Sequence, residues 1–424
     1  MGLYNPLDNA LASLDAQGLR RTRRIVSRLA GSEQSSAEEA EESSRGTRVE
    51  VDGRTLLAFC SNDYLGLANH PIIAQALANG ALREGAGSGA SALISGHRSI
   101  HARLEARLAE RLDPWIPNAD ALYFGAGYLA NIGLVDALAG ITQPGTAPDV
   151  AIFSEALNHA SLVDGTRLAR AHHGATVHVY PHCNTAALAQ LLANSSAITK
   201  IILTDSVFSM DGHLAPLKDL LALAEQYDAW LVVDDAHGFG VLGSIGAGAL
   251  EHCGLSSANI VYMGTLGKAA GVAGAFIAAD CRLIDWLVNR ARPYVYSTAC
   301  PPALSYALLA SLDLLGSTEG DQRRAHLRLL CERLQRGLRA GLRLTHWQVP
   351  QSHSAIHPLI VGENAVALAA AALLRDQGIW VPAIRPPTVP PGTARLRISL
   401  SAEHSAAEVD QLVHGLIDAE RQLT

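Results

Sequence analysis

Between residues 120 and 270, short apolar runs alternate with longer segments in which apolar residues recur at helical spacing. The runs have the length of strands, and segments such as 185–196 (TAALAQLLANSS) repeat apolar residues every three or four positions, as one face of a helix does. The alternation predicts an α/β fold with a mainly parallel sheet, covered by helices on both faces. The carboxyl ends of such strands share one edge, where ligands bind. The predicted strand runs are 121–127, 149–155, 175–182, 200–208, 229–237 and 259–268.

The N-terminal part has a different pattern. Residues 1–30 predict a helical arm rich in arginine, and residues 31–46 are small, polar and acidic, which is typical of a linker. Residues 47–60 predict a hairpin whose turn is Asp52-Gly53.

The alternation stops near residue 300, and the rest of the chain predicts a smaller α+β domain. It opens with a long helical stretch to about residue 342, and strands and helices follow around 354–362, 364–377, 380–384 and 394–401 before a final helix. We therefore expect an N-terminal arm, linker and hairpin, a large ligand-binding domain and a small C-terminal domain, with the ranges 1–57, 58–300 and 301–424.

Composition narrows the function. Of the 424 residues 49% are hydrophobic and 17% charged, and the net charge is −7, so global disorder and binding to nucleic acid or an anionic membrane are not expected. The longest apolar runs, such as 365–374, are about half the ~20 residues that a bilayer requires. Asp8 stands where a secretory signal would be apolar, so we expect a cytoplasmic protein.

Cysteines and histidines do not form a recognisable spacing. The six cysteines are scattered singly, which favours reduced thiols over a disulfide framework. The densest histidine group is His172, His173, His178 and His182, beside Cys183, and its spacing is not that of a zinc site. We expect no metal.

Three positions at strand ends carry candidate chemistry. Asp234 ends the apolar run of LVVDDAHGFG (231–240), where a buried carboxylate is costly unless a cation faces it. Lys268 ends a later run, and a lysine amine near a carbonyl can form a Schiff base. The segment FGAGYLAN (124–131) reads as strand, glycine turn and helix start, which can hold a phosphate. A Schiff-base lysine, an aspartate and a phosphate cradle are together the groups that a protein uses to bind pyridoxal phosphate (PLP).

A plain nucleotide-binding module fits the sequence poorly. The glycine-rich stretch GAGSGASALISG (85–96) contains only GxG and precedes the strand series, and no Lys-Ser/Thr follows the glycine turn of 124–131.

In the segments around Asp234, Lys268 and the glycine turn, and in others along the chain, the sequence resembles the α-oxoamine synthases of the fold-type-I PLP enzymes. The resemblance covers nearly all of the chain from about residue 56. It rests on CSNDYLGLANHP (60–71), GSGASALISG (87–96), FGAGYLAN (124–131), NHASLVDG (158–165), DSVFSMDGHLAPL (205–217), VVDDAHGFGVLG (232–243), TLGKAAGVAG (265–274), YSTACPP (296–302) and IRPPTVPPGTARLRISL (384–400). It implies an aminotransferase-like large domain, a small C-terminal domain and a homodimer whose cofactor site receives residues from both subunits.

The resemblance assigns cofactor roles. Lys268 forms the Schiff base and later acts as general base, Asp234 pairs with the pyridinium nitrogen, and His159 stacks on the ring and touches substrate. Catalytic roles thus fall to Lys268, His159 and Asp234. The implied cofactor-binding residues are Gly127, Tyr128, His159, Ser209, Asp234, His237, Thr265 and Lys268.

The resemblance also assigns substrate roles. Asn62 and Arg397 hold the amino-acid carboxylate, and Thr388 lines the acyl site with an arginine of the N-terminal arm. Both Arg20 and Arg21 are open for that last role, and helix phase favours Arg21. His159, which touches the substrate as well as the cofactor ring, is the remaining implied substrate-binding residue.

The implied reaction is a decarboxylative Claisen condensation of L-alanine with a pimeloyl thioester, carried by CoA or an acyl-carrier protein. Sister condensations stay open: glycine with an acetyl thioester, 5-aminolevulinate synthesis or serine palmitoylation. A catalytically dead scaffold is a further alternative, which the presence of Lys268 disfavours.

Overall fold

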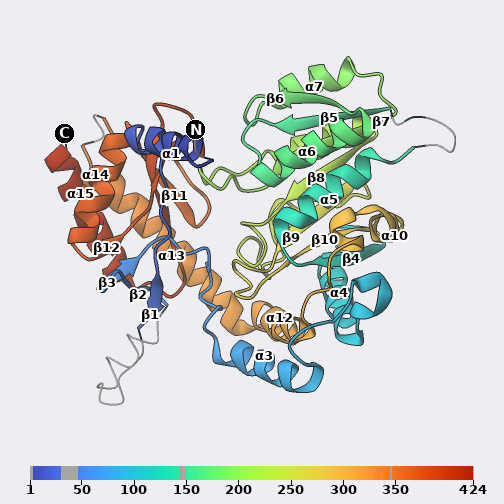
Figure 1. The fold of residues 1–424 in the computed structure, drawn as a ribbon, viewed down its shortest axis with the longest axis horizontal. Coiled ribbons are helices and arrows are strands. Elements are labelled where there is room, and N and C mark those ends of the chain that lie inside the picture. Colours follow the sequence, from blue (N-terminus) through green and yellow to red (C-terminus); the bar gives the residue numbers. More distant parts are fainter. Residues whose placement is uncertain (1–2, 30–45, 143–146, 148, 344–345, 424) are drawn as a thin grey trace. The chain divides into compact units, whose positions relative to one another are not determined.

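The computed structural model describes residues 3–29, 46–142, 147, 149–343 and 346–423 (Figure 1). The chain divides into two compact units. We call Leu65–Ser209 with His213–Arg324 the sheet unit, and Met1–Tyr64 with Met210–Gly212 and Ala325–Thr424 the terminal unit. The three domains predicted from the sequence divide the chain differently, and their ranges stay a prediction.

The sheet unit is built on a seven-stranded sheet, in the order β4-β10-β9-β8-β7-β5-β6. Six strands point the same way, and only β10 runs against them, because it pairs antiparallel with both β4 and β9. The predicted α/β fold and all six predicted strand runs are confirmed, whereas β10 was not predicted. The strands are β4 (Ala119–Phe124), β5 (Val150–Glu155), β6 (Thr176–Tyr180), β7 (Thr199–Asp205), β8 (Ala229–Asp234), β9 (Ile260–Thr265) and β10 (Ala275–Asp280).

Helices cover both faces of this sheet, which is why its strands are apolar on both sides. Alternate strand residues such as Ile201 and Val261 form one core with α5, α6 and α10, while Ile202 and Tyr262 point to the opposite face, where α4 and α8 pack on the strands. The helices of this unit are α3 (Pro71–Glu84), the π-helix η1 (Ala92–Gly96), α4 (Ser99–Leu112), α5 (Gly127–Ala139), α6 (Ala160–His173), α7 (Thr185–Ala193), α8 (Leu217–Gln226), α9 (Ala249–Cys253), α10 (Cys281–Arg290), α11 (Arg292–Val295) and α12 (Pro302–Leu315).

The register of the sheet gathers polar residues at one edge. Asp205, the last residue of β7, lies opposite Asp234, the last residue of β8, and Asp234 lies opposite Met263 of β9. Because parallel strands end together, Thr265 at the end of β9 comes to the same edge.

The terminal unit contains two small sheets. Strands β1, β2, β3 and β12 form one, and β11, β14 and β13 form the other. The predicted hairpin is confirmed as β2 and β3, with Asp52 and Gly53 both at positive φ, as a two-residue hairpin turn requires. Helix α13 (Thr318–Gly341) starts in the sheet unit and ends in the terminal unit. The other elements are β1 (Val26–Arg28), β2 (Arg48–Val51), β3 (Arg54–Ala58), β11 (Ile356–Gly362), β12 (Ile379–Trp380), β13 (Ala383–Ile384), β14 (Ala394–Ser399), α1 (Asn5–Ala16), α14 (Asn364–Asp376) and α15 (Ala406–Leu423).

The N-terminal arm is helical over only part of the predicted length. Helix α1 ends at Ala16, Gly18 follows at φ +61°, and Arg20 and Arg21 lie in irregular backbone. The helix-phase argument for Arg21 therefore does not apply. The predicted linker at 31–46 lies outside the described residues except for Gly46.

None of the helices in the described part of the chain is long and apolar enough to span a membrane.

The sheet core should be sensitive to loss of volume. Ile201 is fully buried in β7, whereas Ile198, three residues earlier, is 71% exposed. We expect Ile201→Ala to lower the free energy of unfolding by about 2–5 kcal/mol, because it leaves a cavity. Ile198→Ala, the matched control, should change it by less than about 0.5 kcal/mol. Chemical denaturation of both variants measures the difference, and equal losses would contradict the assignment of this core.

Candidate functional site

A cavity of about 220 Å³ opens at the carboxyl edge of the sheet, within the sheet unit. Its walls come from the ends of β7, β8 and β9 and from the first turns of α5 and α6. The lining residues are Gly127, Tyr128, Asn131, His159, Ser161, Asp205, Asp234, Ala236, His237, Met263, Thr265 and Lys268. Seven of the eight cofactor-binding residues predicted from the sequence are among them.

Asp234 presents a buried carboxylate to this cavity. It is 4% exposed, and its oxygens accept hydrogen bonds from the side-chain amide of Asn131 (2.7 Å) and the backbone N–H of Ala236 (3.0 Å). Among the residues that the structure describes, no lysine, arginine or histidine forms an ion pair with it. Neutral donors leave the negative charge in place, so the site favours a cationic group beside Asp234.

The neighbouring Asp205 does not double that charge. Burial, and next to it the carboxylate of Asp234, raise the pKa of Asp205 well above its usual value. Its oxygen accepts the backbone N–H of His159 (3.1 Å), which positions the start of α6. The protonated form of Asp205 is therefore favoured.

Asp235, the second aspartate of the DD pair, has a structural role. It is fully buried and accepts hydrogen bonds from the hydroxyls of Ser206 and Tyr262 and from the backbone N–H of Ala249. Burial raises the pKa of Asp235 to about 6. The two adjacent aspartates thus separate into one that faces the cavity and one that ties loops together.

Lys268 and His237 meet inside the cavity. Lys268 Nζ lies 3.0 Å from His237 Nε2, and both residues line the cavity together with Asp234. A lysine amine in hydrogen-bond reach of an imidazole can be oriented by it and can exchange a proton with it.

His159 is held by a chain of hydrogen bonds that leads back to Asp234. The amide of Asn131 donates to Asp234 and to Ser161 Oγ (2.9 Å), and Ser161 Oγ lies 2.7 Å from His159 Nδ1. His159 Nδ1 also accepts the backbone N–H of Ser161 (3.3 Å), because His159 caps α6. Partial burial, together with the charge of Lys268, lowers the pKa of His159 against the opposing effect of Asp234, so the neutral ring is favoured.

The start of α5 forms a cradle without side chains. The N-cap residue Ala126 makes no side-chain cap, so the first N–H groups of the helix are open to a ligand. A Cβ added to Gly127 would lie 2.9 Å from Thr265 Oγ1, which shows how closely the turn approaches the end of β9. The N–H groups and the Thr265 hydroxyl are suited to a phosphate.

These features fit PLP. A buried carboxylate suits the pyridinium nitrogen, and a lysine amine and the glycine turn of the phosphate cradle line the same cavity. The buried Oδ1 of Asn131 has no hydrogen-bond partner among the described residues, although its Nδ2 donates to Asp234.

Sequence reasoning and structure differ at a few positions. Ser209, predicted to contact the cofactor, does not line the cavity. Asn131, Ser161 and Asp205 do line it and were not predicted. Asp205 ends an apolar strand as Asp234 does, so the same sequence signal was available for it.

The predicted amino-acid carboxylate site lies in the terminal unit. Arg397 is 6% exposed and donates to Asn62 Oδ1 (3.4 Å from both terminal nitrogens) and to Ser399 Oγ (2.8 Å). The Tyr64 hydroxyl also donates to Asn62 Oδ1 (3.2 Å). These contacts fix the direction of the Arg397 guanidinium, a group whose planar fork of N–H donors matches a carboxylate.

The predicted acyl-site residues also lie in the terminal unit. Arg21 Nη2 donates to Thr388 Oγ1 (2.9 Å), whereas Arg20 forms an ion pair with Asp15 (2.5 Å). The geometry thus joins Arg21, and not Arg20, to Thr388.

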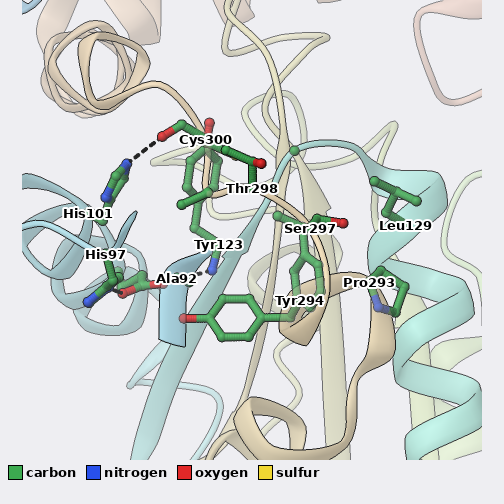
Figure 2. Close-up of a pocket in the computed structure, with 14 residues that line it drawn as sticks. Ala92, His97, His101, Tyr123, Leu129, Pro293, Tyr294, Ser297, Thr298 and Cys300 are labelled. Carbon is green, nitrogen blue, oxygen red and sulfur yellow. Dashed lines mark hydrogen bonds and ion pairs between the residues drawn. The ribbon is translucent and has the colours of Figure 1, made fainter. Parts of the chain in front are cut away.

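A smaller cavity of about 80 Å³ lies on the other side of the glycine turn, also within the sheet unit. Figure 2 shows Tyr123, Tyr294 and Cys300 around it, with His101 bonded to the backbone oxygen of Cys300 (2.9 Å). Burial raises the pKa of Cys300 and lowers that of His101, so both groups are favoured in their neutral forms. This cavity borders the segment YSTACPP but contains no lysine or arginine.

Comparisons with known proteins agree with this geometry. The family described as aminotransferase class I and II matches residues 54–416. An 8-amino-7-oxononanoate synthase of Bordetella petrii is 58% identical over 98% of both chains. Among solved structures, an 8-amino-7-oxononanoate synthase from Francisella tularensis is 26% identical, with a TM-score of 0.70 over 87% of this chain and 98% of that one. A serine palmitoyltransferase from S. paucimobilis, solved with a bound PLP–myriocin aldimine, has a TM-score of 0.84 over 100% and 99% of the chains at 23% identity, which is a likeness of fold.

The glycine cradle gives a direct prediction. In Gly127→Ala the new Cβ must displace Thr265 Oγ1 or the turn itself. Such overpacking costs about 1–3 kcal/mol, so we expect PLP affinity to fall roughly 5- to 150-fold. Gly87→Ala, whose Cβ would have no neighbour within 4 Å, is the matched control. Equilibrium titration of the apo-protein with PLP measures both, and an unchanged affinity in Gly127→Ala would show that the phosphate lies elsewhere.

Proposed function

The chain belongs to the aminotransferase class I and II family, and on that premise we propose that it is a PLP-dependent acyltransferase that makes 8-amino-7-oxononanoate, an intermediate of biotin synthesis. The observation that carries the chemistry is one cavity that is lined by Lys268, the buried Asp234 and the glycine turn at Gly127. The substrates follow from the high identity to relatives with that name.

The reaction joins L-alanine and a pimeloyl thioester. A bond forms between Cα of alanine and the thioester carbonyl carbon, and the thiol leaves. The carboxylate of alanine departs as CO2, and a proton takes its place at Cα. Bound PLP supplies the electron sink that makes the α-proton of alanine acidic enough to remove.

The residues of the cavity hold and move protons in this reaction. Lys268 would hold the cofactor covalently through Nζ, and the same amine is the base that would take the α-proton of alanine. His237 Nε2, 3.0 Å away, orients that amine. Asp234 would keep the ring nitrogen protonated, because its carboxylate is buried at the end of β8 and lines the cavity. The imidazole of His159 is fixed through Nδ1, and it would stack on the cofactor ring.

Substrate binding falls to the residues of the terminal unit. Arg397 and Asn62 hold the alanine carboxylate, which fixes the direction of the Cα–H bond. Arg21 and Thr388 receive the distal carboxylate of the pimeloyl chain, or its ester, as donors at the end of the acyl site. Arg20, engaged with Asp15, is the weaker candidate.

The sister condensations are not favoured. If the chain catalysed one of these reactions, we would expect relatives named for that reaction at a comparable sequence identity. This applies to the condensation of glycine with an acetyl thioester, to 5-aminolevulinate synthesis and to serine palmitoylation. A scaffold without activity is opposed by Lys268, which lines the cavity with its expected partners.

The active unit of this proposal is a homodimer. Residues Ser91 and Thr298 form a β-bridge, which brings the loops GSGASALISG and YSTACPP side by side. Near this bridge Leu93, Ile94 and Tyr296 are 48%, 81% and 72% exposed. Apolar side chains gathered on one face favour an interface, and a second copy of this chain is the partner we propose.

The proposed setting is the cytoplasm, where biosynthetic thioesters are made and thiols stay reduced. The six cysteines are all free thiols, in agreement with that setting. The thiol carrier is CoA or an acyl-carrier protein, and neither nucleic acid nor membrane is an expected partner.

Covalent attachment of the cofactor is the first test. The chain contains three lysines, Lys200, Lys218 and Lys268, so the attachment point is readily found. Borohydride reduction of the PLP-loaded protein should leave the cofactor mass on the peptide of Lys268 alone. Lys268→Ala should abolish both the label and turnover, while Lys200→Arg and Lys218→Arg keep them. A label on another lysine would remove Lys268 from its role.

Product identity tests the substrates. Purified protein with PLP, L-alanine and pimeloyl-CoA should form 8-amino-7-oxononanoate, identified by mass, and kcat/KM for pimeloyl should exceed that for acetyl or palmitoyl thioesters. Discrimination against glycine should be modest, since one methyl group accounts for only about 1–3 kcal/mol. A clear preference for glycine with acetyl-CoA would contradict the substrate assignment and leave the Lys268 result unaffected.

A further inference from the structure

Two buried polar residues of the cofactor cavity, Asn131 and Ser161, have no role in the proposed condensation. Both are fully buried, whereas the neighbouring residue His159 is exposed. Asn131 lies on α5 and Ser161 in the first turn of α6. A buried polar side chain is costly unless its hydrogen bonds are satisfied, so the direction of each of these bonds is constrained.

The side-chain amide of Asn131 can have only one orientation. Its Nδ2 lies 2.7 Å from Asp234 Oδ2, and an ionised carboxylate only accepts hydrogen bonds. A turned amide would place two oxygens at this distance, where they repel each other. Nδ2 therefore donates one hydrogen to Asp234 and the other to Ser161 Oγ, 2.9 Å away.

The next contact fixes the proton of the Ser161 hydroxyl. Ser161 Oγ lies 2.7 Å from His159 Nδ1, and the backbone N–H of Ser161 donates to the same nitrogen (3.3 Å). A backbone N–H is always a donor, so Nδ1 is the acceptor in this cap of α6. The Ser161 hydroxyl thus accepts from Asn131 and donates to His159. Donors and acceptors are then matched along the whole chain of hydrogen bonds from Asp234 to His159.

We propose that Asn131 and Ser161 are positioning residues that hold His159 in the tautomer with its proton on Nε2. The hydrogen bond made by one ring nitrogen decides which nitrogen is protonated. Since Nδ1 is engaged by Ser161, Nε2 is the nitrogen that His159 offers to a ligand of the cavity.

An N–H at this position suits an oxygen atom that carries negative charge, as carboxylates and polarised carbonyls do. In the other tautomer a lone pair would face that oxygen and repel it. The oxygen belongs to the cofactor or to a substrate of the condensation, so the role rests on the proposed function. The tautomer itself is a property of the protein and can be measured without turnover.

Charged groups around His159 act on a different property, the protonation of the whole ring. Burial lowers the pKa of His159, the carboxylate of Asp234 raises it and the charge of Lys268 lowers it. Asp205 accepts the backbone N–H of His159 (3.1 Å), and the Tyr128 ring lies edge-on to the imidazole, with 6.5 Å between centroids. Within the described part of the chain, none of these four side chains hydrogen-bonds to Nδ1. The choice between the tautomers therefore depends on the buried chain of hydrogen bonds.

The test reads the tautomer in the full-length PLP-loaded protein. With 15N in the histidine rings, the chemical shifts of the two nitrogens show which one carries the proton, and the signals lost in His159→Asn identify this residue. Above the titration midpoint, Nε2 should carry the proton in the unmodified protein. In Ser161→Ala, Nδ1 loses the hydroxyl donor, so the ratio of the Nε2–H to the Nδ1–H form should fall roughly 3- to 10-fold.

The same variant should also titrate differently. A hydrogen bond donated to Nδ1 stabilises only the neutral ring, so its loss in Ser161→Ala should raise the titration midpoint of His159 by about 0.5–1 pH unit. Asn131→Ala keeps the Ser161 hydroxyl but removes the amide that directs it. Both effects should then have the same sign and be smaller. Ser99→Ala, which removes an exposed serine from the first turn of α4, is the matched control and should leave His159 unchanged.

Circular dichroism checks that each variant is folded. A proton on Nδ1 in the unmodified protein, or an unchanged tautomer ratio in folded Ser161→Ala, would overturn the proposal. If Ser161→Ala does not fold, Asn131→Ala decides: a lower ratio supports the proposal and an unchanged ratio overturns it. Failure of the proposed function would be visible separately, as absence of product from L-alanine and pimeloyl-CoA, while the 15N signals would still report the tautomer.

Discussion

A negative charge buried at the end of β8 is the constraint around which the site is arranged. Asp234 is 4% exposed, and its hydrogen bonds come from the neutral donors Asn131 and Ala236. Taking a carboxylate out of water costs several kcal/mol unless a cation compensates it. The protonated pyridine ring of the cofactor is such a cation, so the same charge that makes the empty site costly makes it selective for PLP.

The fold concentrates this charge on one residue. The sheet register sets Asp205 beside Asp234, and burial favours the protonated form of Asp205. Asp235 is tied to Tyr262 and Ala249 and faces away from the cavity. Parallel strands that end at one edge therefore supply three carboxyl groups, of which one is left to act on the cofactor.

Much of this arrangement could be predicted from the sequence, because period and turn chemistry are local signals. These local signals predicted the six strand runs, the Asp52-Gly53 hairpin and the placement of Asp234 and Lys268 at one edge of the sheet. Strand β10 was missed, since its run AFIAAD is short and rich in alanine, and its place between β4 and β9 is decided by tertiary pairing. The end of α1 was misjudged although Gly18, a residue typical of helix ends, marks it. Asn131 and Ser161 contribute through hydrogen bonds across the cavity, which no sequence period shows.

The protonation state of the cofactor ring is the most direct test of this account. PLP labelled with 15N in the ring can be bound to the protein and to Asp234→Asn, and the 15N chemical shift reports whether the nitrogen carries a proton. At neutral pH the account predicts a protonated nitrogen in the unmodified protein and an unprotonated one in Asp234→Asn, because a neutral amide cannot hold that charge. Asp219→Asn, at an exposed position on α8, should match the unmodified protein. The same chemical shift in the unmodified protein and in Asp234→Asn would contradict the central role of this carboxylate.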